Sequence, residues 1–352
     1  MPVSVVVGGQ YGSEGKGKVA LAVAREKHAH CVVRVGGTNS GHTIVDGEKP
    51  RSFRQLPAST FADNSIAVLP PGALIDIDIF EKEVAELGLE PDRVVVSPLA
   101  SLITAEDRGS ESSLVDRIGS TGSGTGAALV RRISRGALVR LAKDEEKLRP
   151  YLRDTTDLMR SVLAKGQRIV IEGSQGFGLS LLHGGFYPHA TGRDTTAAAF
   201  VAEAGLSPRD VDEIVLVLRA HPIRVAGTSG PLEQEMSWEE VAAEAGLPEG
   251  YKELTTATRK VRRIGRFELD VVRRAIAVNQ PTSIVLNHLD YLDPAVRAGE
   301  RTRRACDFLS FVEAGIGQKI DKVGLGPNSL VARSEFNATR NHPSSRHSLR
   351  AL

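Results

Sequence analysis

The first candidate site is a glycine-rich segment with two lysines near the start of the chain. It follows the apolar run Val3 to Val7 and reads Gly8-Gly9-Gln10-Tyr11-Gly12-Ser13-Glu14-Gly15-Lys16-Gly17-Lys18. A continuous Val/Ile run is typical of a buried parallel strand, and glycines after it let backbone N–H groups approach an anion at a helix N-terminus. Lys16 and Lys18 would neutralise phosphate charge. The sequence therefore predicts a phosphate-binding loop, although its glycine spacing differs from the common P-loop pattern.

Three further segments combine glycines with polar side chains. They are Gly36-Gly37-Thr38-Asn39-Ser40-Gly41-His42-Thr43, Ser120-Thr121-Gly122-Ser123-Gly124-Thr125-Gly126 and Glu172-Gly173-Ser174-Gln175-Gly176. Taken singly, a histidine after glycines is more often a turn residue than a catalyst, and Gly/Ser/Thr runs are usually plain loops. A fourth segment, Pro188 to Thr196, could simply supply a helix N-cap. Their meaning depends on whether they occur together in one family.

A basic segment lies later in the chain and reads Thr255-Thr256-Ala257-Thr258-Arg259-Lys260-Val261-Arg262-Arg263-Ile264-Gly265-Arg266. A solvated basic loop is the commoner explanation for such a run. Guanidinium groups can also grip carboxylates through two hydrogen bonds, which suits a substrate that carries two carboxylates. Both interpretations stay open on these residues alone.

Together these segments resemble the signatures of the adenylosuccinate synthetase family of purine-pathway ligases, over nearly the whole chain from Val3 to Pro327. The resemblance implies an α/β fold with a mostly parallel central sheet flanked by helices, a P-loop-like nucleotide-binding architecture and mobile active-site loops. It also implies an ATP- or GTP-dependent carbon–nitrogen ligase that uses Mg²⁺. The family's catalytic residues correspond to Ser13, Lys16, His42 and Gln175, and its metal ligands to Ser13 and Gly41.

The resemblance also assigns two nucleotide subsites. The triphosphate donor would contact Gly12, Ser13, Glu14, Gly15, Lys16, Gly17, Gly41, His42, Thr43, Asn287, Asp290, Gly324, Gly326 and Pro327. The purine monophosphate would contact Ser13, Asn39, Ser120, Thr121, Gly122, Arg135, Gln175 and Thr191. His42 would be the general acid at the purine 6-oxygen, because an imidazole has its pKa near working pH. Arg135 would enter the partner subunit's pocket, so the resemblance implies a homodimer.

The basic segment resembles the family's aspartate-binding loop, with Thr256, Ala257, Thr258, Arg262 and Arg263 at the binding positions. Asn287-His288-Leu289-Asp290 resembles the Asn/Thr-Lys-x-Asp motif that reads guanine, whose aspartate accepts hydrogen bonds from N1–H and the 2-amino group. His288 stands where that motif has a lysine. ATP, dATP and GTP therefore all stay open as the phosphoryl donor.

Ser13 is the one departure in the first segment, because the family's usual residue there is an aspartate that acts as the catalytic base. A serine cannot easily remove the purine N1 proton before the 6-oxygen attacks the γ-phosphate. The serine resembles the phage-type branch, the 2-amino-2'-deoxyadenylosuccinate synthetases, which join L-aspartate to dGMP. A shorter side chain leaves room for the guanine 2-amino group and can accept a hydrogen bond from it. The expected product is 2-amino-2'-deoxy-N6-succinyladenylate, a precursor of 2-aminoadenine DNA.

Two alternatives remain on the sequence. The first is an ordinary adenylosuccinate synthetase that acts on IMP, aspartate and GTP. The second is a non-catalytic nucleotide-binding paralogue, which the loss of the aspartate at Ser13 would favour.

The composition limits the class of protein. The 352 residues are 41% hydrophobic and 25% charged, enough for a large α/β core. The net charge of +2 is spread along the chain, which argues against nucleic-acid and membrane partners. Cys31 and Cys306 are isolated, which argues against disulfides and zinc. With neither a signal peptide nor a membrane-length apolar run, a cytoplasmic location is expected, in the host cytoplasm if the protein is viral.

The elements that must position these residues follow from the apolar runs. Strands of a parallel sheet are expected over Val3 to Val7, Cys31 to Val35, Ile66 to Leu69, Val94 to Val96, Ile169 to Ile171, Ile214 to Leu218 and Ile284 to Leu286. Helices are expected over Asp78 to Leu87, Asp144 to Leu163, Thr195 to Ala204, Trp238 to Ala245 and Leu269 to Val278. Ligands should gather at the carboxyl ends of the strands. We expect a single domain over 1–336 and a polar tail over 337–352.

Overall fold

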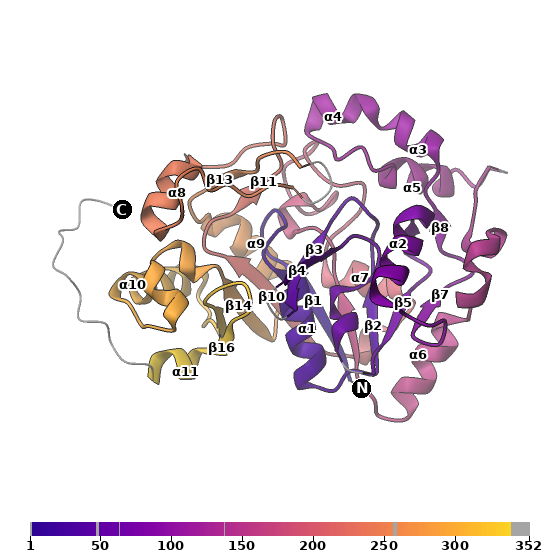
Figure 1. Cartoon of the computed structure of the whole chain (residues 1–352), viewed down its shortest axis with the longest axis horizontal. Helices are drawn as coiled ribbons and strands as arrows, with labels where there is room; N and C mark the ends of the chain where they lie inside the picture. Colours follow the sequence, from indigo (N-terminus) through magenta and orange to yellow (C-terminus); the bar gives the residue numbers. More distant parts are fainter. Residues whose placement is uncertain (1, 47–48, 63, 137, 256–258, 339–352) are drawn as a thin grey trace.

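A computed structural model of the chain gives the fold, and it describes residues 2–46, 49–62, 64–136, 138–255 and 259–338. The centre is a nine-stranded sheet in the order β16-β15-β14-β10-β1-β9-β2-β5-β7 (Figure 1). All neighbouring strands are parallel except β15 and β16. The predicted α/β fold with a mostly parallel central sheet flanked by helices is confirmed.

All seven predicted strands are present. They are β1 (Val3–Gly8), β2 (Cys31–Arg34), β5 (Ile66–Leu69), β7 (Val94–Val96), β9 (Ile169–Glu172), β10 (Val211–Arg219) and β14 (Ser283–Asn287). The sequence analysis missed β15 (Lys322–Gly324) and β16 (Leu330–Ala332) at one end of the sheet. β7 is equally short but consists of three buried valines, whereas β15 has one apolar residue between Lys322 and Gly324, and the residues of β16 are only half-buried.

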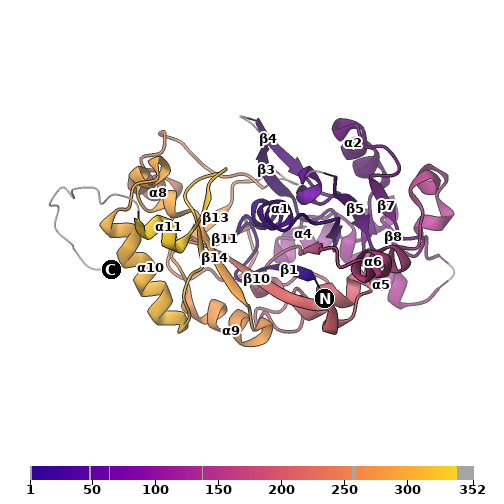
Figure 2. The ribbon, with the colours of Figure 1, turned by 90° about the horizontal axis from the view of Figure 1, so that it is seen from below.

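Alternate side chains of β1 enter two different cores, one on each face of the sheet. Val5 and Val7 pack in a cluster with residues of α6 (Thr155–Ala164), α7 (Ala197–Ala204), α9 (Leu269–Asn279) and α10 (Arg303–Ile316). Val6 packs in a second cluster with α1 (Lys16–Glu26). Figure 2 shows α1 and α9 on opposite sides of β1 and β10. The sheet is therefore covered on both faces, which explains why its strands are continuous apolar runs.

The predicted helices match α2 (Ile77–Leu87), α7, α8 (Trp238–Ala245) and α9 closely, but the prediction of one helix from Asp144 to Leu163 is wrong. That segment divides into a 3-10 helix over Glu146–Tyr151 and α6. Pro150 lies inside the first piece, where it removes a backbone donor, and Asp154 caps α6 through a hydrogen bond to the Asp157 N–H. The apolar pattern continues across this break, so it could not reveal it.

Smaller elements surround the sheet. The helices α3 (Ala105–Ser110), α4 (Ser112–Ile118) and α5 (Thr125–Ile133) form one group, and β3 (His42–Asp46) pairs with β4 (Lys49–Phe53) as a hairpin. The strands β6 (Leu74–Ile75) and β8 (Ser101–Leu102) pair in parallel. A three-stranded antiparallel sheet has the order β11 (Ile223–Arg224), β13 (Arg263–Gly265), β12 (Glu235–Met236).

The last described element, α11 (Arg333–Ala338), already includes the first residues of the predicted tail. The division into a domain over 1–336 and a tail over 337–352 therefore stays a prediction, and residues 339–352 lie outside the described range. Within the described part of the chain, no helix has the length and apolar composition that a membrane crossing needs.

Five neighbouring strands of the parallel sheet end at residues that carry chemistry. They are Gly8 of β1, Arg34 of β2, Glu172 of β9, Arg219 of β10 and Asn287 of β14. Because the carboxyl ends of parallel strands lie at one edge of a sheet, the loops after these strands meet there. This edge positions the candidate site.

Candidate active site

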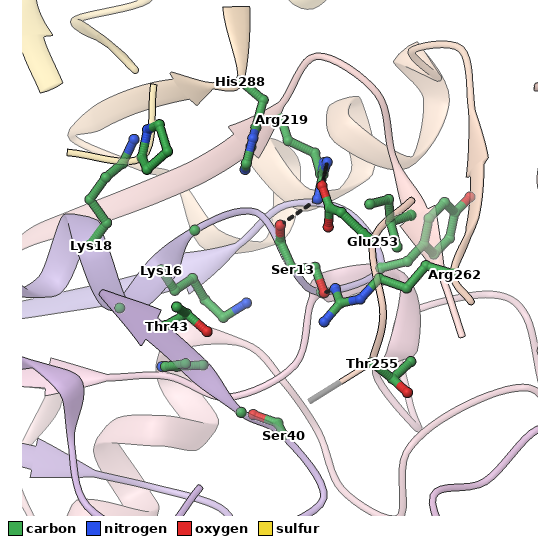
Figure 3. Close-up of a pocket in the computed structure, with 18 of the residues that line it drawn as sticks. Ser13, Lys16, Lys18, Ser40, Thr43, Arg219, Glu253, Thr255, Arg262 and His288 are labelled. Atoms are coloured by element: carbon green, nitrogen blue, oxygen red, sulfur yellow. Dashed lines mark hydrogen bonds and ion pairs between the residues drawn. The ribbon is translucent and has the colours of Figure 1, made fainter. Parts of the chain in front are cut away.

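A cavity of about 550 Å³ is lined by residues that follow β1, β2, β9, β10 and β14 (Figure 3). Fifteen predicted site residues line it: Gly12, Ser13, Gly15, Lys16, Gly17, Asn39, Gly41, His42, Thr43, Thr121, Gln175, Arg262, Asp290, Gly326 and Pro327. The other described ones lie outside its lining: Glu14, Ser120, Gly122, Arg135, Thr191, Arg263, Asn287 and Gly324. Thr256, Ala257 and Thr258 lie outside the described residues.

The loop after β1 leads into the N-terminus of α1. Gly15 precedes the helix with φ of 88°, and no side chain caps this end of α1. A Cβ on Gly15 would lie 2.9 Å from Asn287 Nδ2, so only glycine fits here without displacing a neighbour. A strand, a glycine turn and a helix whose first N–H groups lack a side-chain cap form a site for a phosphate.

Glu14 and Lys16 form a buried ion pair behind this loop. Lys16 Nζ lies 2.6 Å from Glu14 Oε2, and the side chains are 3% and 0% exposed. Glu14 Oε1 accepts hydrogen bonds from the backbone N–H groups of Gln10 and Gly12, at 3.2 and 2.8 Å. Glu14 therefore holds the loop and directs Lys16, which lines the cavity.

Lys18 does not have the role that the sequence suggested for it. Its Nζ donates to the carbonyl oxygens of Gly326 and Ser329, at 3.0 and 3.3 Å, instead of being left free for phosphate. Burial lowers the pKa of Lys18 to about 8. Lys18 thus joins α1 to the loop after β15, which contains two of the residues that the resemblance assigns to the triphosphate donor, Gly326 and Pro327.

Ser13 projects from the loop into the cavity, and two arginines contact it. Its backbone is left-handed with φ of 59°, and the residue is exposed. Arg262 Nη1 donates to Ser13 Oγ, and Arg219 Nη1 donates to Ser13 O at 2.9 Å. Figure 3 shows Ser13 and Arg262 pointing toward each other.

Arg219 connects the first loop to a carboxylate across the cavity. Its Nη2 lies 3.0 Å from Glu253 Oε1, which also accepts a hydrogen bond from the Tyr291 hydroxyl at 2.7 Å. Although burial raises the pKa of Glu253, the positive charges led by Arg219 lower it to about 2. Gln10 fixes the backbone of Arg219: its Oε1 accepts from Arg219 N at 2.9 Å and its Nε2 donates to Arg219 O at 3.2 Å.

His42 is buried against a charged pair. Its Nδ1 lies 2.5 Å from Glu172 Oε1, and Arg34 Nη1 contacts the ring and also donates to Glu172 Oε1 at 3.0 Å. Burial and the charge of Arg34 lower the pKa of His42 to about 3. The expected imidazole with a pKa near working pH is not seen in this arrangement. A neutral imidazole has one N–H, which Nδ1 directs at the Glu172 carboxylate, so donation from Nε2 to an oxyanion requires a protonated ring.

The monophosphate candidates are only partly brought together. Asn39, Thr121 and Gln175 line the cavity, and Asn39 Nδ2 donates to Thr191 Oγ1 at 3.4 Å. Ser120 Oγ accepts from the Gly122 N–H at 3.2 Å and so shapes the loop before α5.

The cavity also has an end formed by residues after β14. Asp290 lies 3.4 Å from Arg297 Nε through its Oδ2, while its buried Oδ1 has no hydrogen-bond partner. Burial raises the pKa of Asp290 and lowers that of His288 far below its ordinary value. Asn287 Nδ2 donates to Glu14 O at 2.8 Å, so this motif residue supports the first loop.

Arg263 lies apart from this cavity in the structure. Its Nη2 and Nε contact Glu235 at 2.7 and 2.8 Å, across the small sheet. Arg262, one residue earlier, points into the cavity instead. The alternation of side chains entering β13 separates the two arginines.

The sequence analysis missed Arg34, Arg219 and Glu253 as site residues. Arg34 and Arg219 are the last residues of buried strands, and a charged residue ending an apolar run is a signal that could have found them. Glu253 sits in a loop without a distinctive pattern, and only the contact with Arg219 identifies it.

The described lining is strongly cationic. Lysine and arginine occupy six positions, whereas only Glu253 and Asp290 bring carboxylates; the cations are Lys16, Lys18, Arg219, Arg224, Arg262 and Arg297. Such a surplus stabilises ligands that carry several negative charges, such as phosphates and dicarboxylates.

The side chains available as ligands also limit how a metal ion can bind in this cavity. Among the described residues, no group of three or more His, Cys, Asp or Glu side chains is placed to hold an ion. Mg²⁺ commonly takes one or two protein oxygens and completes its shell with water and substrate phosphate. The Ser13 hydroxyl and the Gly41 carbonyl, both at the cavity, fit that mode.

Known proteins similar to this chain belong to the family that the sequence signatures resemble. The family model for adenylosuccinate synthetase matches residues 5–144 and 136–300. The adenylosuccinate synthetases of Methanococcus aeolicus and Archaeoglobus fulgidus are both 36% identical to the chain, covering 93% of it and 97% and 96% of their own lengths.

Two solved structures share the fold. The cyanophage S-2L succinoaminodeoxyadenylate synthetase bound to dGMP and dATP as an energy donor has a TM-score of 0.81 at 30% identity, covering 96% of this chain and 97% of that one. A fully ligated adenylosuccinate synthetase from Plasmodium falciparum has a TM-score of 0.82 at 19% identity, covering 95% of this chain and all of that one. The latter similarity concerns the fold alone.

Proposed function

We propose that dGMP is the purine substrate of this chain, which belongs to the adenylosuccinate synthetase family and is a carbon–nitrogen ligase of that family. The proposed reaction joins the amine of L-aspartate to C6 of dGMP while a nucleoside triphosphate gives its γ-phosphate to the departing 6-oxygen. The product is 2-amino-2'-deoxy-N6-succinyladenylate.

The observation that carries the proposal is the position of Ser13. Its hydroxyl lies at the cavity surface, where the usual family member has a carboxylate, and it contacts Arg262. A serine there removes one negative charge and leaves space for a 2-amino group beside N1. The S-2L enzyme, which was solved with dGMP, supports the same substrate, because it covers nearly the whole chain at 30% identity.

The remaining roles follow from the cavity. Lys16 and the N-terminus of α1 would hold the donor phosphates. His42 would donate Nε2–H toward the charge that develops on the 6-oxygen, as a protonated ring whose Nδ1–H stays on Glu172. Gln175 would supply an amide at the same oxygen. Arg262 would bind a carboxylate of aspartate. Mg²⁺, held by Ser13, Gly41 and the donor phosphates, would neutralise phosphate charge.

The nucleoside triphosphate that donates the phosphoryl group is proposed to be ATP or dATP, with GTP as the alternative. A charged Asp290 pairs with two guanine donors, but adenine offers one donor and one acceptor. Neutral His288 lines this end of the cavity and can offer either an N–H or a lone pair. The dATP of the S-2L structure favours the adenine reading.

A homodimer that shares Arg135 is also proposed. Arg135 lies just after α5, in an exposed position with φ of 54°. Val130 and Ile133 on α5 and nearby Leu138 are 68, 66 and 80% exposed. Three large apolar side chains this exposed beside Arg135 favour a surface that another copy of the chain covers.

Phosphate release by the purified protein tests the substrate. Mg²⁺ and L-aspartate are held constant while dGMP, GMP and IMP are crossed with ATP, dATP and GTP, and the product mass is measured. Release that needs dGMP and yields the succinylated product supports the proposal. Release with IMP alone would establish the ordinary reaction, which the names of the archaeal relatives favour. No release in any combination would favour a nucleotide-binding protein without catalysis.

A further inference from the structure

Arg262 is anchored everywhere except at its tip. Its backbone N–H donates to Glu253 O at 2.9 Å, and its carbonyl accepts from Trp238 Nε1 at 2.7 Å. Its Nε donates to Leu254 O at 3.1 Å. The Nη1 that contacts Ser13 Oγ is therefore the part of this side chain that can change partner while the rest stays in place.

Ser13 is anchored in the complementary way. Its backbone carbonyl accepts from Arg219, which is itself held by Glu253 and buried at 1% exposure. Its hydroxyl lies in the cavity and has Arg262 as its partner. The backbones of Arg262 and Ser13 are thus both held in place. The hydrogen bond from the charged guanidinium to the neutral hydroxyl is the contact that a ligand can replace.

We propose that this contact couples the two substrate subsites, a proposal that rests on the function proposed above. A carboxylate competes well with a neutral hydroxyl for a guanidinium, because the pair carries opposite charges and can form two parallel hydrogen bonds. An L-aspartate carboxylate that enters the cavity takes Arg262 Nη1 from Ser13 Oγ. The hydroxyl then turns to the purine monophosphate, and a purine that takes the hydroxyl first frees Arg262 for the carboxylate.

The coupling has a required thermodynamic form. Each ligand removes the same competing contact, so each strengthens the binding of the other by the same factor. A factor of about five or more is the size that two-site coupling commonly reaches. No structural change beyond the two side chains is needed.

Calorimetry without triphosphate measures the factor, because no turnover occurs. The Kd of dGMP is measured with and without saturating L-aspartate, and the Kd of L-aspartate with and without dGMP, with IMP in a second series. In the wild type we expect both Kd values to fall by about fivefold or more, by equal factors. Ser13→Ala should reduce the factor to near one, because the competing contact is gone.

Arg266→Lys is the matched control, since this cation of the same basic segment contacts Glu244 outside the cavity lining and should leave the factor unchanged. Equal coupling in the wild type and Ser13→Ala would overturn the inference, as would independent binding in the wild type. A wild type that binds IMP but not dGMP, with coupling lost in Ser13→Ala, overturns the proposed substrate and supports the coupling. Absence of all monophosphate binding refutes both.

Discussion

His42 Nδ1 lies 2.5 Å from Glu172 Oε1, and both side chains are buried. Glu172 also accepts from the backbone N–H groups of Ala58 and Ser59, at 3.1 and 3.0 Å. One carboxylate at the end of β9 therefore fixes the first residue of the β3–β4 hairpin and the turn that follows the hairpin. The orientation of the proposed proton donor depends on packing far from it in sequence.

The buried histidine makes stability depend on pH. The folded-state pKa of His42 is about 3, against about 6.5 in an unfolded chain, so the unfolded state binds more protons between these values. The free energy of unfolding should therefore fall as pH is lowered from 7.5 to 5, by up to about 1.4 kcal/mol per pH unit for this group. His42→Gln should flatten that slope in urea titrations. Replacing exposed His28 with Asn is the control, and an unchanged slope in His42→Gln would contradict the assignment.

A Ser13→Asp change tests the meaning of the serine. The left-handed backbone at Ser13 accepts aspartate well, so the fold should be unaffected. We expect the variant to lose kcat/KM for dGMP and to gain IMP turnover, by about 100-fold if the carboxylate works as a base. Steady-state kinetics with both monophosphates measure this. Unchanged dGMP kinetics would show that Ser13 does not select the purine.

Gly15→Ala should disable the phosphate loop. The new Cβ would need a left-handed backbone and would lie 2.9 Å from Asn287 Nδ2. Gly166→Ala is the matched control, because its φ is 71° but nothing lies within 4 Å of a Cβ there. Both should lose about 1–2 kcal/mol of stability from the backbone alone, and only Gly15→Ala should also lose triphosphate binding. Thermal shifts with and without ATP and GTP distinguish the two effects.

Lys18→Met should loosen the loop after β15. Two hydrogen bonds from a cation to carbonyl oxygens are lost, a change of about 1.5–3 kcal/mol if the loop must be held for donor binding. The KM for the triphosphate should rise about tenfold or more, whereas the KM for the monophosphate stays the same. Lys27→Met is the control. Lys27 lies just after the C-terminal end of α1 and pairs with Glu213 of β10, so its loss should change neither value.

Charges placed on the exposed side of α5 should separate the proposed dimer. Val130→Asp and Ile133→Asp should lower the molar mass measured by light scattering toward that of one chain. Mixing inactive Arg135→Ala with inactive Lys16→Ala should restore activity, because one of the two sites in a mixed dimer keeps both residues. A wild type that is monomeric at micromolar concentration would overturn the shared site.

The strands could be predicted because each is a continuous apolar run bounded by loops, as in β1 and β9. The loop after β1 could be predicted for the same local reason, since glycine spacing and lysines lie in one stretch. The contacts among Ser13, Arg219 and Glu253 could not, because they join residues 206 and 34 positions apart in the chain, with no local pattern that links them. Lys18 and Arg263 have the residue types of ligand-binding groups, but nearby carbonyl and carboxylate oxygens already occupy them.

The side-chain amide of Gln10 pairs with both backbone groups of Arg219, as a further residue of β1 would. The loop is thereby registered against β10 beyond the last regular pair of the two strands, Gly8 with Val217. Because both partners on β10 are backbone groups, any residue except proline at position 219 offers them. The amide of Gln10 is therefore the part of this anchor that a transplanted loop must carry with it.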